Sequence, residues 1–431
     1  IGVAALTAHA PIAAAAPPRD TETSAAEARL PSLSDADRAA LAPYLERGPV
    51  TWVGFSSAQT ELPPVIVLTR VHAPAARVAA LIADPRGYPR FMPALDRVDI
   101  KGEHARTIAY DWSWTVAIFA LHGRNRMTVS PPPSVPGAPF RVDVVSTGGD
   151  LGEGRLVWRV FPDGPDAAVV ELAMRIDMRD ANYIARALAS GGTSVNRTIN
   201  VALAHVMLLA TQTEAERQSG YRAPSLPLGP LERPHVDLDA LRELVRRGDL
   251  VMLDTRGEYL QSAVVIGRGG ATAPMVRRVL ADPEEFGRSF VHGSRAHVIG
   301  RDARGVTFSW SIPLPLVGVG GVMRLQTQGT EVRVDGVSGS FKDGRWRFDT
   351  VQLPWSEVAV IGWARFDPTD STALVKRMVG SNGYFRQGLV AGVEMMTIRS
   401  LRARVWELRR TERERAAAAV KSSARDTASA Q

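Results

Sequence analysis

Three aromatic residues alternate along one predicted strand: Tyr110, Trp112 and Trp114. Side chains at i, i+2 and i+4 of a strand point to the same face of a sheet. On an inward face these rings would give a pocket apolar walls, and each indole would add one hydrogen-bond donor. The alternatives are that the rings fill a core or pack on the outer face. The chemistry that this pattern suggests is the binding of an apolar molecule.

Groups that perform covalent or metal chemistry are missing from the sequence. The chain has no cysteine, which excludes disulfides, thiolate catalysis, iron–sulfur clusters and cysteine-ligated zinc. It contains no H-E-x-x-H or G-x-S-x-G motif, no P-loop and no complete dinucleotide-binding fingerprint. We therefore predict no catalytic residue, no metal and no cofactor.

The composition is that of an ordinary globular protein. Of 431 residues, 45% are hydrophobic and 23% are charged, which excludes wholesale disorder. The net charge of +7 is a mild excess for this length, and no basic stripe alternates with aromatic residues, so nucleic-acid binding is not expected. The length allows two or three domains.

The sequence contains an internal repeat. Val78–Pro85 (VAALIADP) returns as Val276–Pro283 (VRRVLADP), an offset of 198 residues, and Trp112 pairs with Trp310 at the same offset. Further on, Gly154-Arg155 matches Gly344-Arg345 at an offset of 190 residues. A proline-rich loop in the first copy accounts for the difference. The chain is therefore predicted to hold two copies of one domain.

Each copy has the same predicted order of elements. A strand at residues 64–71 precedes a helix at 75–83, and several strand-like runs follow between residues 98 and 174. A long helix closes the copy, with one apolar face formed by Val195, Ile199, Ala202, Val206 and Leu209. A sheet that curves around one helix is expected to leave an internal cavity, and function is expected to lie there.

The motif Ala83–Pro93 (ADPRGYPRFMP), together with this order of elements, resembles the START-like superfamily, also called SRPBCC or Bet v 1-like. Its Tyr-Pro-x-Phe-Met-Pro part looks like the coenzyme Q-binding and polyketide cyclase/dehydrase branch. The resemblance implies an α+β fold of tandem helix-grip domains, each a curved antiparallel sheet around a long C-terminal helix. It also implies a pocket for a sterol, lipid, quinone or polyketide. In the second copy the motif departs, since residues 286–290 read FGRSF.

The predicted ligand-binding residues are aromatic and methionine side chains expected to line the two cavities. They are Tyr88, Phe91, Tyr110, Trp112, Trp114 and Met207 in the first copy, and Phe286, Phe308, Trp310, Met395 and Met396 in the second.

The last predicted helix contains several glycines, among them Gly383, Gly388 and Gly392. Each glycine inside a helix costs about 1 kcal/mol relative to alanine, so another interaction should compensate. Two explanations are open: close packing of the helix backbone on the sheet, or a hinge at the mouth of the cavity.

The predicted domains are bounded by composition. Residues 1–33 are expected to be a signal-peptide remnant and disordered leader, 34–218 the first START-like domain and 219–237 a proline-rich linker. Residues 238–412 form the second domain, and 413–431 a disordered tail. The arginine-rich segment Arg402–Arg415 is expected to be a solvated helix end, or else a weak membrane-surface contact. The leader predicts a periplasmic or secreted protein.

The resulting hypothesis is a non-enzymatic protein that binds or transports a hydrophobic small molecule outside the cytoplasm. One alternative is an enzyme similar to the polyketide aromatase/cyclases. Another is a protein-interaction module in which one cavity has degenerated.

Overall fold

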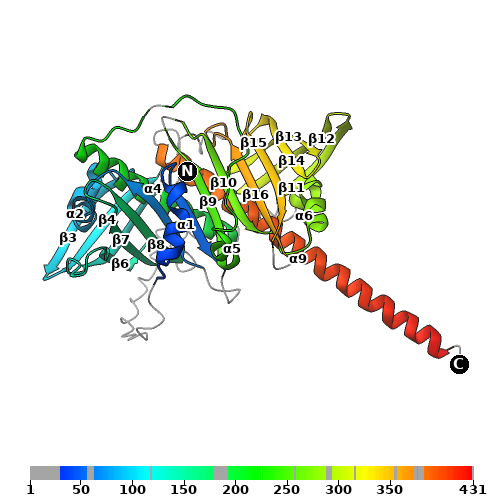
Figure 1. The fold of residues 1–431 in the computed structure, drawn as a ribbon, viewed down its shortest axis with the longest axis horizontal. Coiled ribbons are helices and arrows are strands. Elements are labelled where there is room, and N and C mark those ends of the chain that lie inside the picture. Colours follow the sequence, from blue (N-terminus) through cyan, green and yellow to red (C-terminus); the bar gives the residue numbers. More distant parts are fainter. Residues whose placement is uncertain are drawn as a thin grey trace, which may run out of the picture.

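The computed structural model describes residues 30–429, except 56–62, 117–118, 178–192, 225, 257–258, 288–293, 315–316, 354–356, 372–375 and 377–382. The predicted leader therefore lies almost entirely outside the described residues. The described part is an α+β structure with a large antiparallel sheet and several helices (Figure 1).

The first copy begins with a helix and ends with a longer one. Its elements are α1 (Asp35–Leu45), β1 (Val50–Gly54), β2 (Val65–Val71), α2 (Ala75–Ala83), the 3-10 helix η1 (Pro85–Arg90), β3 (Leu95–His104), β4 (Thr107–Val116), β5 (Phe119–Val129), β6 (Phe140–Gly149), β7 (Glu153–Pro162), β8 (Ala168–Asp177) and α4 (Thr193–Ser219).

The second copy repeats this order. Its elements are α5 (Arg242–Arg247), β9 (Gly248–Asp254), β10 (Ser262–Arg268), α6 (Ala273–Leu280), α7 (Pro283–Gly287), β11 (Arg295–Asp302), β12 (Gly305–Leu314), β13 (Val317–Gln328), β14 (Glu331–Gly339), β15 (Arg345–Gln352), β16 (Val358–Arg365) and α9 (Gly383–Ser429). The repeat and most of its elements are as predicted, but β1 and β9 were not foreseen.

Strands β1 and β9 join the two halves into one sixteen-stranded antiparallel sheet, in the order β11-β12-β13-β14-β15-β16-β10-β9-β1-β2-β8-β7-β6-β5-β4-β3. Val50 pairs with Met252 and Gly54 pairs with Gly248. At the centre, Trp52 pairs with Leu250, its own counterpart at the repeat offset of 198. The join therefore has local twofold pseudosymmetry, as in a symmetric dimer.

The two faces of the central strands carry separate hydrophobic clusters. On the inner face, residues such as Val53 and Val251 pack with α2, α4, α6 and α9. On the outer face, Trp52 and Leu250 pack with α1, α5 and the linker. Because these strands are covered on both sides, they read as continuous apolar runs such as VIVLTRV in β2.

The long helices α4 and α9 pack on the inner face and also against each other. A Cβ added to Gly388 would lie 2.7 Å from the carbonyl oxygen of Ala202, and one added to Gly392 would lie 2.7 Å from Cγ2 of Thr198. These glycines therefore permit a close crossing of the two helices. Close packing thus accounts for Gly388 and Gly392, but the partner is the other long helix rather than the sheet.

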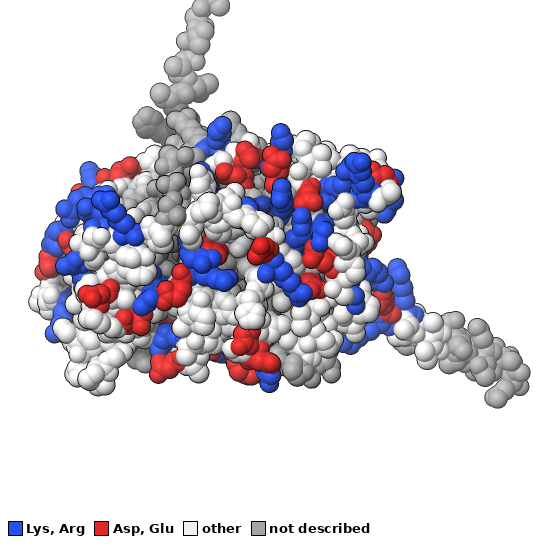
Figure 2. Space-filling model, turned by 45° about the horizontal axis from the view of Figure 1, so that its top comes forward, with Lys and Arg blue, Asp and Glu red and all other residues white. Residues whose placement is uncertain are grey.

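The C-terminal segment differs from the predicted disordered tail. Helix α9 continues to Ser429 and projects from the body (Figure 1), and alanine, the strongest helix former, fills residues 416–419. The expectation of a solvated arginine segment is also wrong at its start. Arg402 is buried against Asp249, and Arg404 is mostly buried in an ion pair with Glu285. Elsewhere acidic and basic side chains are interspersed over the face in Figure 2.

Candidate functional site

In the first copy, Tyr88, Phe91 and Tyr110 lie together in the inner cluster. Tyr88 on η1 donates its hydroxyl to the carbonyl of Ile82, and its ring meets Phe91 edge-on at 5.8 Å. Burial raises the pKa of Tyr110 to about 12, although a hydrogen bond of 3.1 Å that Asn125 donates to the phenol oxygen acts to lower it. Both phenols therefore stay neutral and polar inside an apolar interior.

The two tryptophans of β4 have different surroundings. Trp112 is half-buried against the inner cluster, and its indole N–H is shielded from solvent without a hydrogen-bond partner in the described part of the chain. Trp114 instead donates to the carbonyl of Pro93 at 2.8 Å, and its ring stacks at 6.3 Å on Phe385 of α9. Trp112 is thus the donor left available, while Trp114 contacts the other half.

In the second copy, an aromatic cluster forms on the inner side of the sheet. Trp310, the counterpart of Trp112, stacks on Phe341 with ring centroids 5.7 Å apart. Phe366 contacts both Phe341 at 5.2 Å and Trp346 at 5.0 Å. The indole N–H of Trp310 is also buried and has no partner among the residues described. The buried Phe308 lies two residues before Trp310 on β12.

Phe341 has an unusual backbone conformation that aims its ring into this cluster. Its φ is +61°, in the left-handed region that residues with a Cβ rarely adopt. The N–H of Phe341 donates to the carbonyl of Asp370 at 2.7 Å, and its own carbonyl accepts from Gly344 at 3.0 Å. The turn between β14 and β15 therefore holds Phe341 in place at a local energetic cost.

Glu394 on α9 places a carboxyl group beside these rings. Its Oε1 accepts a hydrogen bond of 3.1 Å from the indole of Trp346, and its side chain is fully buried. Its Oε2 has no hydrogen-bond partner within the described ranges. Burial raises the pKa of Glu394 to about 8, although the Trp346 hydrogen bond opposes this. At neutral pH the group is therefore a neutral acid with one free O–H donor.

Glu394 was not among the residues predicted from the sequence. The available signal was a charged residue inside the apolar run Val390–Met396, at a position where the first copy has Ala204. The neighbouring aromatic positions differ in the same way, because Trp346 and Phe366 correspond to Leu156 and Ile176. The two interiors are therefore not equivalent: among the described residues, the second combines a buried acid with an aromatic cluster, and the first has Ala204 at the position of that acid.

The remaining predicted residues are spread along the long helices and α7. Met207 is half-buried against the inner cluster, and Met395 is fully part of it. Met396 is half-buried on α9 outside both hydrophobic clusters. Phe286 belongs to α7, but its side chain lies outside the described residues.

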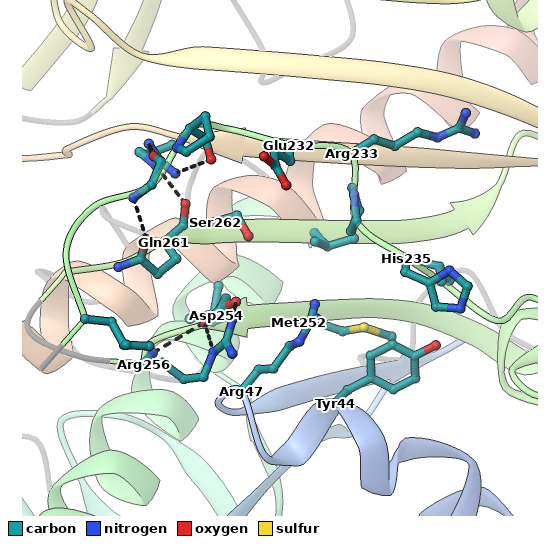
Figure 3. A pocket seen from close by; sticks show the side chains of 18 of the residues that line it. Tyr44, Arg47, Glu232, Arg233, His235, Met252, Asp254, Arg256, Gln261 and Ser262 are labelled. Carbon is teal, nitrogen blue, oxygen red and sulfur yellow. Dashed lines mark hydrogen bonds and ion pairs between the residues drawn. The ribbon is translucent and has the colours of Figure 1, made fainter. Parts of the chain in front are cut away.

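A separate groove lies on the outer face, between the linker and strands β9 and β10 (Figure 3). Its volume is about 580 Å³. Arg365 fixes the linker above it by donating to the carbonyls of Gly229 at 2.7 Å and Pro230 at 3.3 Å. Arg256 at its edge is paired with Asp254. Because this groove is on the far side of the sheet, it is distinct from the inner aromatic clusters.

Two further observations concern only the described residues. They contain no group of three or more His, Asp or Glu side chains placed to hold a metal ion. None of their helices combines the length and apolar character that a membrane span requires.

No protein-family model and no curated protein matches this chain. Solved structures similar to it include the Zhui aromatase/cyclase from Streptomyces sp. R1128, with 21% identity and a TM-score of 0.31, over 36% of this chain and 94% of that one. The STAR-related lipid transfer protein from Xanthomonas axonopodis has 15% identity and a TM-score of 0.30, over 38% and 98%.

The di-domain aromatase/cyclase StfQ from the steffimycin biosynthetic pathway has 13% identity and a TM-score of 0.27, over 79% of this chain and 98% of that one. This chain resembles START-like proteins. The α+β assignment rests on the elements described above.

Proposed function

We propose that this protein binds a hydrophobic small molecule inside its two START-like halves, each of which grips its own long helix. The observation that carries the proposal is a set of inward polar atoms that have no hydrogen-bond partner among the described residues: the indole N–H groups of Trp112 and Trp310 and Oε2 of Glu394. A buried polar group without a hydrogen bond costs about 1–3 kcal/mol, so a bound ligand that supplies partners would be stabilised.

The interior chemistry defines the ligand class. Apolar walls favour a hydrocarbon body, at roughly 25 cal/mol for each Å² of apolar surface removed from water. The free donor of a neutral Glu394 favours an oxygen acceptor, such as a carbonyl or hydroxyl, in the second half. A carboxylate or phosphate at this position would be opposed by the surrounding low dielectric. The preferred ligand is therefore a neutral, mostly apolar molecule with an oxygen at one end.

Native mass spectrometry tests this proposal directly. The protein purified from its own host, or incubated with an organic extract of that host's lipids, is expected to carry one or two apolar ligands per chain. Trp310→Phe should weaken binding because it removes a buried donor, whereas Trp406→Phe changes a largely exposed ring on α9 and should not. Protein that carries nothing and takes up nothing would refute the proposal.

A second candidate function is catalysis of the polyketide aromatase/cyclase type, which Glu394 favours. A carboxylic acid with a pKa of about 8 can protonate a ligand oxygen at neutral pH. Glu394→Gln keeps the hydrogen-bonding shape but cannot transfer a proton. If the protein is an enzyme, this variant should bind a synthetic linear polyketide and fail to cyclise it. A carrier would bind it unchanged and release it unchanged.

The location outside the cytoplasm stays part of this proposal. It is supported by the uncharged, small-residue segment 1–18. Fractionation of the native host tests it, since the mature chain should be recovered with the periplasm or the medium.

A further inference from the structure

A cluster of ionised side chains lies where the two halves meet on the inner face. Asp249 on β9 is completely buried and pairs with two arginines of α9. Arg402 donates to both its carboxylate oxygens, and Nε of Arg399 lies 3.0 Å from Oδ2. Arg399 also donates to the carbonyls of Val53 at 3.0 Å and Gly54 at 3.2 Å. The cluster therefore contacts the strands of both halves.

A third arginine, Arg197, approaches this cluster from α4 of the first half. It precedes Thr198, which packs against Gly392 two turns before Arg399. Its guanidinium makes no hydrogen bond or ion pair with the described residues, and its Nε is buried. Burial, followed by repulsion from Arg399, lowers the pKa of Arg197 to about 10. Three guanidinium groups are therefore close enough to influence one another around a single carboxylate, Asp249, which pairs with Arg399 and Arg402.

The excess of positive charge is costly in a partly dehydrated place. Removing an ion from water is compensated only by a well-placed counter-ion or by hydrogen bonds. Asp249 supplies one negative charge against the three of Arg197, Arg399 and Arg402. A bound anion would lower the energy of this arrangement.

The fold itself does not need these charges. At the pseudosymmetric position, the first half has Thr51, Leu209 and Gln212 in place of Asp249, Arg399 and Arg402, and Gln387 corresponds to Arg197. Gln212 donates to the carbonyl of Arg70 just as Arg402 donates to that of Arg268, its counterpart. Neutral side chains therefore close the same junction at the other end. The arginines are an addition to the architecture.

We propose that Arg197, backed by Arg399 and Arg402, binds a phosphate-type oxyanion at the junction of the two halves. Guanidinium groups bind such anions through paired, charge-assisted hydrogen bonds. The anion is either free phosphate or the phosphate of a lipid headgroup. Because the arginines come from both halves, the bound anion would also hold the halves together. This site is independent of the proposed inner ligand site.

Thermal unfolding of the full chain in inorganic phosphate tests the site, with chloride at matched ionic strength as the reference. A ligand that binds the native state raises Tm with its concentration, so phosphate should give a saturable rise that chloride does not. Arg197→Gln should raise the apparent Kd for phosphate by about tenfold or more. Arg197→Lys should raise it by less, because lysine keeps the positive charge but lacks the planar guanidinium that forms paired hydrogen bonds. Arg410→Gln, at an exposed position of α9, should bind like wild type.

Three results would overturn the proposal: equal responses to phosphate and chloride, an unchanged apparent Kd in Arg197→Gln, or an equal loss in Arg410→Gln. If Arg197→Gln does not fold, Arg197→Lys decides between the same outcomes.

Vesicles distinguish the two sources of phosphate. If the anion is a headgroup, the protein should bind phosphatidic acid vesicles but not phosphatidylcholine vesicles, and inorganic phosphate should compete. If it is free phosphate, Tm should respond to phosphate without binding to either vesicle. Vesicle binding that Arg197→Gln and phosphate leave unchanged would contradict a site at this junction.

Discussion

Glu394 and Ala204 occupy the same position of the two repeats, on helices that pack against each other, yet only Glu394 brings a carboxyl group into an aromatic interior. Its contact with Trp346 has no counterpart in the first half, where that position is Leu156. The two halves have the same order of helices and strands, but the side chains of their interiors differ in chemistry. The polar end of a ligand is therefore expected in the second half.

Glu394→Gln should change how stability depends on pH. The pKa of Glu394 is about 8 in the native state, above its ordinary value of 4.5. Between these pH values the native state holds a proton that the unfolded chain releases, so wild type should lose about 1.4 kcal/mol of stability for each pH unit as pH rises. Glutamine does not titrate. Urea unfolding at pH 5, 6, 7 and 8 should show a decline in wild type that is absent from the variant, and parallel curves would contradict a buried acid.

His205 should have the opposite effect at acidic pH. It is fully buried, its Nε2 lies 2.5 Å from Oγ1 of Thr51, and burial lowers its pKa from 6.5 to about 3. Between these pH values the unfolded chain therefore binds a proton at this histidine that the native state does not bind. The free energy of unfolding should consequently decrease as pH falls from 6.5 toward 3. When the free energy of unfolding is measured in urea at several pH values, His205→Gln should reduce this decrease at acidic pH. Thr51→Val keeps the imidazole and should show the same decrease as wild type.

Gly388→Ala should weaken the contact between the long helices. The new Cβ would meet backbone atoms of Ala202 at 2.7 and 3.2 Å, and backbone cannot move aside like a flexible side chain. We expect a loss of about 1–3 kcal/mol in the free energy of unfolding. Gly383→Ala is the matched control, because a Cβ there meets nothing within 4 Å. A stabilised Gly388→Ala would show that helix propensity, not packing, decides this position.

At Phe341 the usual ranking of alanine and glycine should reverse. The left-handed φ of +61° is strained for any residue with a Cβ, so Phe341→Gly should be more stable than Phe341→Ala by about 1 kcal/mol. At Phe308, in the regular strand β12, alanine should be the more stable of the two. Denaturant unfolding of the four variants measures both differences. The same order at both positions would argue against a strained Phe341.

The sequence was informative about local order and uninformative about contacts between the halves. Periodicity located strands such as β2 and the helix α4, since these patterns depend on neighbouring residues. It did not reveal β1, because Val50–Gly54 is too short to show a pattern. The crossing of α4 and α9 was also missed, although Gly388 and Gly392 were a trace of it.

The candidate site was predicted in part for the same reason. Aromatic alternation identified Trp112 and Trp310, both inward and both with an unpartnered N–H in the described part of the chain. Glu394 was overlooked because one charged residue in an apolar helix has no periodic signature. Arg402 was expected in solvent because its partner, Asp249, lies 153 residues away. Partners distant in sequence become evident only when the chain is folded.

The pairing of β1 with β9 has a consequence for either half alone. Each half would expose a row of unpaired backbone N–H and C=O groups along Val50–Gly54 or Gly248–Asp254. Because Trp52 lies opposite its own repeat counterpart in an antiparallel pair, the same edge strand of a second copy could pair with it in the same way. A separated first half should therefore self-associate through this edge. Because the two edges pair within one chain, the halves keep this interface while their interiors differ, as Glu394 and Ala204 do.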